Sequence, residues 1–390
     1  SPPTGPDGRG SGDYDSGGAI SRTPRGGNLF NGAQYQRPVA LAVPIPVPIR
    51  SGGAVQGYVR EADFYVALIA SDETDGNYET EYSFGTARGH LDMMKDGTYV
   101  QVIGLTFKSK EQISMDMVQK MPAAGKDYPY NKTSEVLWRR TYVPDKRDDG
   151  SYPGANIAEL LYANETNGAF LVIVGTTTGY GRTFGGYDNF TATVGWSASG
   201  ADGYITKLNH LTGEELSPEN DSNDTQWKSS ARIMSQPGKI DIIHGACLDV
   251  ENKYIYVVGS TTGTMDSLMK RSHSEGVPFP FVAKVSLHSL ELEWKTQYAT
   301  SAGMGAAATG CSPHPDGNGV YIAGTVQNGD VLHHWKDANL KTSSSGMDDV
   351  FLSLLDEDSG AVRWIRQLGT PHDDVLAGGQ GGGLMVKKDG

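Results

Sequence analysis

The chain has little cysteine, a deficit of positive charge and no long hydrophobic run. Only two of its 390 residues are cysteines, Cys247 and Cys311, so the sequence does not encode a disulfide framework. Lys and Arg total 33 against 46 Asp and Glu, and the formal net charge is −13. Such a surface repels phosphate backbones, so we expect no nucleic-acid partner. No apolar run reaches the length of about eighteen residues that a membrane-spanning helix needs, and we expect no such helix.

Glycine and proline are abundant. The chain holds 51 Gly and 19 Pro, which indicate many turns rather than long helices. Its length exceeds what one compact core usually holds, so a repeat fold or several domains are expected. The chain begins at Ser1 without a visible signal peptide, and we interpret it as a mature or trimmed chain.

The strongest pattern is a recurring segment of alternating apolar residues that ends in glycine and small hydroxyl residues. Residues 254–263 (YIYVVGSTTG) are one copy. Alternating β-branched and aromatic residues that end in Gly predict a strand running into a turn. Recurrence at a long spacing predicts a repeat architecture. The other copies are residues 100–106, 170–177 and 320–325, and the four glycines are Gly104, Gly175, Gly259 and Gly324.

Two further strand types accompany the Gly-ending segment. One starts with Asp and has an aromatic residue two positions later. Its copies start at Asp63, Asp202 and Asp349, and residues 279–285 are a copy without the Asp. The other starts with an aromatic ring, and these rings are expected in the core. The five rings are Tyr78, Trp138, Trp227, Trp294 and Trp364.

Turn residues join these strand types as hairpins. Residues 210–213 and 356–360 join the Asp-aromatic strand to the aromatic-headed strand, and residues 316–319 lead into a Gly-ending strand. The predicted order in each unit is an inner strand of small residues, the Gly-ending strand, the Asp-aromatic strand and the aromatic-headed strand. Four antiparallel strands are the content of one β-propeller blade. The predicted fold class is therefore all-β.

Residues 281–325 carry the resemblance to a known family. They contain Val282-Ala-Lys, Trp294, Asp316-Gly-Asn and the strand 320–325, and this unit resembles the SBBP β-propeller repeat. The resemblance covers roughly residues 60–390, strongly from 200 onward and weakly over 107–135. It implies a propeller that is usually extracytoplasmic, and it supplies no catalytic residues.

The five aromatic-headed strands predict about five blades. Residues 38–49 hold three internal prolines, so we expect an edge strand or an extended cover there. This segment precedes the first Asp-aromatic strand, and it is expected to close the ring with the C-terminal strands. A larger ring that continues beyond residue 390 is the main alternative. The predicted organisation is a Gly/Pro/Ser-rich arm over residues 1–37 and a propeller over 38–390, with long insertions at 107–135, 179–201, 213–226, 263–278 and 327–347.

Glycosylation sequons indicate the compartment. Five Asn-x-Ser/Thr sites predict a secreted eukaryotic glycoprotein, although a chain rich in Asn, Ser and Thr yields a few by chance. Cys247 and Cys311 both follow small residues at matching positions of successive units. A disulfide between neighbouring units and two buried thiols fit equally well. The sequon residues are Asn131, Asn164, Asn189, Asn220 and Asn223.

Few residues suggest catalysis. His244 near Cys247 resembles a nucleophile pair, but no third orienting residue is evident. His333 and His334 are neighbours on an extended segment, so their side chains point to opposite sides, and a solvated loop is the simpler interpretation. The Gly-rich residues 181–186 and 378–383 lack the Lys-Ser/Thr of a phosphate-binding loop.

Three acidic stretches could hold calcium loosely. Residues 72–75, 145–149 and 373–374 are rich in Asp, but none has the spacing of an EF-hand. Surface turns explain them as well, and no other cofactor is expected.

Two classes of function follow. The first is a non-catalytic extracellular scaffold, structural or adhesive, for example a filament subunit. It would assemble through residues 1–50 with copies of itself or with other surface proteins or glycans. The second is a secreted propeller enzyme, quinoprotein-like or glycosidase-like, that uses the central funnel. The aromatic set is more often blade core than a carbohydrate platform, which favours the scaffold.

Overall fold

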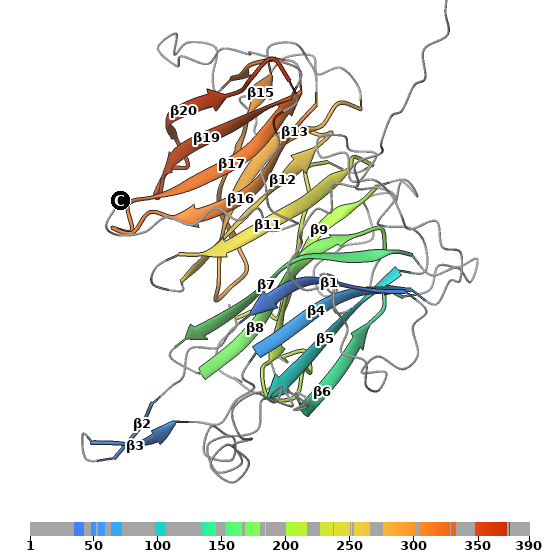
Figure 1. The fold of residues 1–390 in the computed structure, drawn as a ribbon, viewed down its shortest axis with the longest axis vertical. Coiled ribbons are helices and arrows are strands. Elements are labelled where there is room, and N and C mark those ends of the chain that lie inside the picture. The colour runs from blue at the N-terminus through green and yellow to red at the C-terminus, as the bar shows by residue number, and fades with distance from the viewer. Residues whose placement is uncertain are drawn as a thin grey trace, which may run out of the picture. The chain divides into compact units, whose positions relative to one another are not determined.

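A computed structural model describes twenty strands, which are labelled in Figure 1. The chain divides into two compact units, Ser1–Gly32 and Ala33–Gly390, and all described residues lie in the second unit. The described residues are 35–42, 48–51, 54–58, 64–71, 98–106, 135–145, 153–165, 168–179, 184, 200–216, 227–236, 238–249, 251, 253–265, 276–300, 305–327, 329–332, 348–372 and 374.

Sixteen of the strands form four antiparallel sheets of four strands each. Sheet 1 has the order β1-β4-β5-β6, with β1 (Tyr35–Ala42), β4 (Phe64–Ser71), β5 (Thr98–Thr106) and β6 (Glu135–Tyr142). Sheet 2 has the order β7-β8-β9-β10, with β7 (Ala155–Glu165), β8 (Gly168–Thr177), β9 (Asp202–Asn209) and β10 (Ser230–Ile233). Sheet 3 has the order β11-β12-β13-β14, with β11 (Asp241–Leu248), β12 (Tyr254–Thr261), β13 (Phe279–Ser286) and β14 (Leu292–Gln297). Sheet 4 has the order β16-β17-β19-β20, with β16 (Ala306–Pro313), β17 (Gly319–Gln327), β19 (Asp348–Asp356) and β20 (Val362–Leu368).

The remaining four strands form two short antiparallel pairs. β2 (Pro48–Ser51) pairs with β3 (Ala54–Tyr58), and β15 (Ala299–Thr300) pairs with β18 (Val331–Leu332). None of the described elements is a helix that is long and apolar enough to cross a membrane. The chain is therefore all-β, and its four-stranded antiparallel sheets are consistent with propeller-like blades.

The predicted strand order is confirmed in sheets 3 and 4, where the small-residue, Gly-ending, Asp-aromatic and aromatic-headed strands follow one another. In sheet 2 the Gly-ending strand β8 and the Asp-aromatic strand β9 stand second and third as predicted, but the first strand β7 carries larger residues and Trp227 lies before the fourth strand β10. In sheet 1 the two middle types are exchanged, since the Asp-aromatic strand β4 stands second and the Gly-ending strand β5 stands third.

Each of the four sheets pairs a glycine with an aromatic residue of the neighbouring strand. The four pairs are Tyr65 with Gly104, Gly175 with Tyr204, Gly259 with Phe281, and Gly324 with Phe351. At Gly324 an added Cβ would lie 2.5 Å from ring carbons of Phe351, so the ring occupies the space that glycine leaves. At Gly104 in sheet 1, an added Cβ would instead meet the indole of Trp138 on the fourth strand, 2.8 Å from its Cε2.

Two predictions about the ring differ from the structure. Residues 60–142 were expected to supply two blades, headed by Tyr78 and Trp138, but the described strands there form sheet 1 alone. A count of five is thus not confirmed, and Tyr78 lies outside the described residues. The predicted strand over 38–49 is divided, because β1 ends at Ala42 and Pro48 begins a separate hairpin. Prolines lack the N–H that a continuous ladder requires.

Ring closure by the N-terminal strand is likewise absent from the described strands. β1 is the edge strand of sheet 1 and pairs with β4, whereas the C-terminal strands β19 and β20 belong to sheet 4. The first strands of consecutive sheets contact one another, β1 with β7, β7 with β11 and β11 with β16.

The core lies between consecutive sheets. One cluster of buried residues joins sheets 1 and 2 and includes Tyr65 and Tyr204. A second joins sheets 2 and 3, and a third joins sheets 3 and 4 around Tyr256 and Phe351. Side chains alternate between the two faces of each strand, so every inner sheet contributes to two clusters.

Three turns between third and fourth strands share one geometry. Each contains a residue with a positive φ, namely Gly213 (70°), Leu290 (53°) and Gly360 (67°). In each, the N–H of that residue donates to the carbonyl four residues earlier. A left-handed residue at this place is typical of a short hairpin loop, and glycine adopts it without a Cβ penalty. We call residues 209–213, 286–290 and 356–360 the left-handed turns.

Each left-handed turn offers one carbonyl to the preceding sheet, from its second residue in turns 209–213 and 356–360 and from its third residue in turn 286–290. A side-chain donor from that sheet reaches it every time, so the acceptor is satisfied at all three interfaces. We call this interaction the sheet-to-turn contact. Its hydrogen bonds run from Trp138 Nε1 to His210 O (3.0 Å), from Lys207 Nζ to His288 O (2.7 Å), and from Trp294 Nε1 (2.7 Å) and Lys284 Nζ (3.0 Å) to Glu357 O.

Candidate functional site

The candidate site is an acidic pocket bordered by three turns of sheets 3 and 4. Its first wall is the turn from β11 to β12. The Asp249 carboxylate accepts hydrogen bonds there from the backbone N–H groups of Lys253 (2.6 Å) and Tyr254 (2.8 Å). Asp side chains hold turns in this way because the carboxylate replaces a backbone acceptor.

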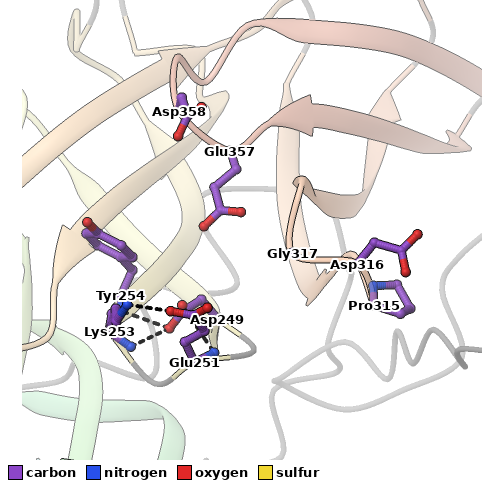
Figure 2. A pocket seen from close by; sticks show the side chains of 9 residues that line it. All are labelled: Asp249, Glu251, Lys253, Tyr254, Pro315, Asp316, Gly317, Glu357 and Asp358. Atoms are coloured by element: carbon purple, nitrogen blue, oxygen red, sulfur yellow. Dashed lines mark hydrogen bonds and ion pairs between the residues drawn. The ribbon is translucent and has the colours of Figure 1, made fainter.

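The other two walls come from sheet 4. They are the turn from β16 to β17, around Asp316, and the left-handed turn 356–360. The pocket between the three turns has a volume of about 560 Å³. Figure 2 shows its lining side chains: Asp249, Glu251, Lys253, Tyr254, Pro315, Asp316, Gly317, Glu357 and Asp358.

Negative charge dominates this lining, with five carboxylates and one ammonium group. Glu251 and Lys253 form an exposed ion pair of 2.5 Å. Behind the wall, the buried Lys284 ammonium lies 3.5 Å from the Glu357 carboxylate and 3.9 Å from the centre of the Tyr254 ring. The Asp249 carboxylate is thus occupied by hydrogen bonds within its turn, and those of Glu251 and Glu357 form ion pairs with lysines. The pocket can attract cations weakly.

The described residues contain no group of three or more His, Cys, Asp or Glu side chains arranged as metal ligands. Most of the stretches predicted to hold calcium, residues 72–75, 146–149 and 373, lie outside the described residues. Asp145 is exposed. The Asp374 carboxylate accepts the backbone N–H of Thr370, a structural role at the end of the described chain.

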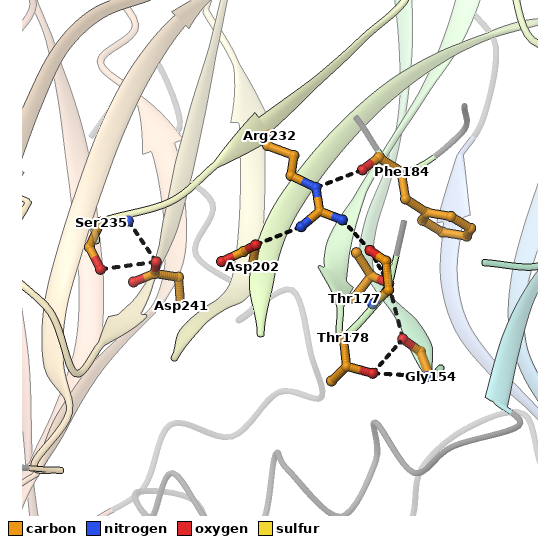
Figure 3. A network of polar contacts seen from close by, with 9 residues as sticks. Gly154, Thr177, Thr178, Phe184, Asp202, Arg232, Ser235 and Asp241 are labelled. Atoms are coloured by element: carbon orange, nitrogen blue, oxygen red, sulfur yellow. Dashed lines mark hydrogen bonds and ion pairs between the residues drawn. The ribbon is translucent and has the colours of Figure 1, made fainter. Parts of the chain in front are cut away.

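A second polar cluster, at the start of β9 and β11, has a structural role (Figure 3). The Arg232 guanidinium forms a buried ion pair of 2.5 Å with Asp202 and donates to the carbonyls of Phe184 (3.0 Å) and Gly179. Burial raises the pKa of Asp202, and the Arg232 charge opposes that rise. Gln297 and Gln367 donate likewise to Gly263 O and Gly329 O, so a long polar side chain of the fourth strand fixes the loop after the second strand.

Asp241 belongs to the same cluster. Its carboxylate accepts hydrogen bonds from the Ser235 backbone (2.6 Å), the Ser235 hydroxyl (3.0 Å) and the Thr261 hydroxyl. Burial raises the pKa of Asp241 to about 6, although these hydrogen bonds oppose the shift. The carboxylate organises the loop ends and has no open side toward a substrate.

Cys247 and Cys311 are joined by a disulfide between the first strands of sheets 3 and 4. Of the two alternatives for these cysteines, the structure contains the bond. A sulfur in a disulfide is not a thiolate, so Cys247 cannot act with His244 as a nucleophile pair, which agrees with the prediction of no catalytic residues there. His244 is buried, and its Nε2 lies 2.9 Å from the Ser260 hydroxyl oxygen.

Glu159 is an unusual carboxyl that the sequence analysis did not single out. It lies on β7, the first strand of sheet 2, and burial raises its pKa to about 8. Within the described part of the chain its carboxylate accepts one long hydrogen bond, from the Leu160 backbone N–H at 3.3 Å. At the bulge of β7 the strand steps from Ile157 to Glu159, and the matching steps in β11 and β16 end at Gly245 and Gly310. In the sequence, a charged residue at the position where β11 and β16 have glycine could have drawn attention to Glu159.

The other predicted residues are placed as follows. Trp138, Trp227, Trp294 and Trp364 are half-buried, three of them on fourth strands and Trp227 just before β10. Asn164 is exposed near the end of β7, where a glycan would be accommodated. Asn131, Asn189, Asn220, Asn223, His333 and His334 lie outside the described residues.

Comparisons with known proteins add little. No family model matches the chain, so the resemblance to SBBP repeats is not confirmed, and no curated protein matches it. Among solved structures, a europium-containing methanol dehydrogenase is similar over 83% of this chain and 43% of its own, with 12% identity and a TM-score of 0.31. This chain thus spans less than half the length of that enzyme, and a likeness at this level carries no argument about function.

Proposed function

We propose that the chain is a non-catalytic extracellular scaffold that assembles with copies of itself. The observation that carries the proposal is the disulfide between Cys247 and Cys311 together with the sheet-to-turn contacts. Disulfides persist in oxidising compartments, and here the bond ties two neighbouring sheets that hydrogen bonds already join. Such a body suits mechanical support better than turnover, because its polar groups are used for joining sheets.

Assembly through residues 1–50 is part of the proposal. Removal of residues 1–50 is expected to lower the mass of the oligomer in multi-angle light scattering, while the Cys247–Cys311 bond stays intact in a thiol assay. An unchanged mass would rule out the arm as the assembly element. A glycan on the exposed Asn164, detected by peptide mass spectrometry of native material, is expected if the chain is secreted.

The enzyme alternative has one observation in its favour, the raised pKa of Glu159. Carboxyls with strongly raised pKa values occur often at catalytic sites. A glycosidase would also need a second carboxylate within about 5–10 Å of the first. Chromogenic glycosides assayed with the native chain and with Glu159→Gln decide this alternative. Turnover that disappears in the variant would favour the enzyme, and no turnover by the native chain would favour the scaffold.

A further inference from the structure

The chain enters the first strands of sheets 3 and 4 through the same backbone hydrogen bond. Asp241 begins β11, and its N–H donates to Ala201 O at 2.7 Å. Ala306 begins β16, and its N–H donates to Pro278 O at 3.0 Å. Ala201 and Pro278 directly precede the Asp-aromatic strands β9 and β13 of the sheets before. This bond therefore marks the place where one sheet ends and the first strand of the next sheet begins.

Asp374 forms this bond a third time, at the end of sheet 4. Its N–H donates to Asp348 O at 2.7 Å, and Asp348 directly precedes Asp349, the head of the Asp-aromatic strand of sheet 4. The side chain of Asp374 also behaves like that of Asp241, since each carboxylate accepts a backbone N–H from the loop that precedes it. Asp374 therefore stands where a further first strand would begin.

The sequence that follows Asp374 has the pattern of a first strand. Its second and third residues are apolar, its fourth is alanine, and its fifth is glycine. Glycine holds the fifth position of β11 and β16 as well, where it completes a β-bulge. The three aligned segments are residues 241–247 (DIIHGAC), 306–312 (AAATGCS) and 374–380 (DVLAGGQ).

A buried hydroxyl on sheet 4 lacks the donor that such a strand would supply. Thr176 of β8 accepts the N–H of Ile243, the third residue of β11, at 2.9 Å. Thr325 holds the same place in β17, directly after the glycine. It is 2% exposed, so the chain itself covers it, but its hydroxyl has no hydrogen-bond partner among the described residues. The third residue of 374–380 is Leu376, whose N–H would satisfy this hydroxyl.

Consecutive first strands meet at fixed positions. The seventh residue of β11, Cys247, is bonded to the sixth residue of β16, Cys311, and their Cα atoms are 5.9 Å apart. The same two positions of β7 and β11 are Leu161 and Ala246, which lie in one core cluster. A strand that follows β16 is therefore expected to bring its sixth residue to the seventh residue of β16.

We propose that residues 374–380 form the first strand of a further sheet, which packs on sheet 4 beside β16 and places the Leu376 N–H on the Thr325 hydroxyl. Residues 375–380 lie outside the described residues, whereas Asp374 and Thr325 are described. Sheet 4 thus receives a strand of the same chain at the place where sheets 2 and 3 each receive their successor. The inference concerns the chain's own fold and does not depend on the proposed self-assembly.

An engineered disulfide tests the position of this strand. Ser312 is the seventh residue of β16 and Gly379 is the sixth residue of 374–380, so Ser312→Cys with Gly379→Cys copies the native disulfide. After air oxidation of the dilute full chain, peptide mass spectrometry is expected to find a second bond within most molecules. The control combines Ser312→Cys with Gln380→Cys. Its side chain would point to the other face of the strand, so little bond is expected.

A second bond that forms equally in both pairs, only in the control or in neither would overturn the proposal. Hydrogen exchange resolved to single residues covers the case in which the new cysteines disturb folding. The Leu376 N–H of the native chain is expected to be protected, and Thr325→Val is expected to lower its protection about fivefold or more, whereas Thr325→Ser keeps it. The Tyr256 N–H of sheet 3 reports any general loss of stability. An unprotected Leu376 N–H, or one that Thr325→Val leaves unchanged, would also overturn the proposal.

Discussion

Replacement of Glu159 by glutamine is predicted to stabilise the protein, and more so at higher pH. Burial raises the pKa of this carboxyl from 4.5 to about 8, and the described surroundings contribute no cation that would offset the cost of its charge. Glutamine has the shape of the protonated acid and keeps the oxygen that accepts the Leu160 N–H at 3.3 Å. The variant removes the charge without opening a cavity.

The sign and size follow from proton linkage. The folded state binds the proton of the Glu159 carboxyl more tightly than the unfolded state does. Below about pH 4.5 the carboxyl is protonated in both states, and its contribution to stability is then fully present. Between about pH 4.5 and 8 unfolding releases the proton, and the free energy of unfolding falls by up to about 1.4 kcal/mol per pH unit. Above about pH 8 the loss is complete and amounts to about 5 kcal/mol at most, because water reaching the carboxyl reduces it.

Urea unfolding followed by tryptophan fluorescence at pH 4 to 9 measures this difference. The free energy of unfolding of Glu159→Gln minus that of the native chain is expected to be near zero at pH 4 and several kcal/mol at pH 9. Subtraction removes the contribution of Asp241, whose pKa is also raised, to about 6. Glu293→Gln, at an exposed carboxylate of β14, is the control and is expected to show no trend. An equal difference at pH 4 and pH 9 would show that Glu159 is ionised and solvated in the fold.

The joints between sheets give three further predictions, all measured as free energies of unfolding. Gly360→Ala is expected to cost about 2–3 kcal/mol, because its Cβ would clash with the Trp294 ring, 2.6 Å from Cδ2, at a φ of 67°. Gly276→Ala, with a φ of 83° and open space around it, is expected to cost only about 1 kcal/mol, and equal costs would contradict the close approach. Trp294→Phe is expected to cost about 1–2 kcal/mol more than Trp364→Phe, since of these two indoles Trp294 alone donates to a turn carbonyl among the described residues. A larger loss at Trp364 would contradict this reasoning. Joint replacement of Cys247 and Cys311 by alanine removes a disulfide with a sequence separation of 64 and is expected to cost about 4 kcal/mol. Reductant should leave the free energy of unfolding of this variant unchanged. If reductant also left that of the native chain unchanged, the disulfide would be refuted.

The sequence predicted the strand types and their order because both depend on local pattern. Alternation, a terminal glycine and a turn residue suffice to recognise a strand such as Tyr254–Thr261, and the hairpin turns 210–213 and 356–360 were recognised from glycine and aspartate. The strand order of sheet 1 was beyond such reasoning, since Tyr65 and Gly104 are register partners just as the ring and the glycine are in the other sheets. Only packing decides between the two arrangements.

The candidate site was less predictable than the fold. Two of its walls, at Asp316 and Glu357, were predicted as separate turns, but their approach to Asp249 depends on how sheets 3 and 4 pack. Asp202 and Asp349 illustrate the same limit. Their recurrence was visible, yet their purpose became clear only with the fourth strand in place, where Arg232 and Gln367 meet them at 2.5 Å and 2.7 Å.

Neighbouring sheets are joined by the same hydrogen bond to a turn carbonyl, although the residue that donates it differs from sheet to sheet. Trp138 and Trp294 donate an indole N–H to the next turn, but in sheet 2 the Lys207 ammonium takes over that bond and Trp227 lies over the ammonium at 4.5 Å. The turn that Lys207 reaches is also the one with Leu290 in the left-handed conformation, where the other two turns have glycine. Glycine is needed where an indole lies against the turn, as at Gly360, because a Cβ would meet the ring. Where lysine supplies the donor, a buried leucine is accommodated, so what the repeat conserves is a satisfied carbonyl between neighbouring sheets.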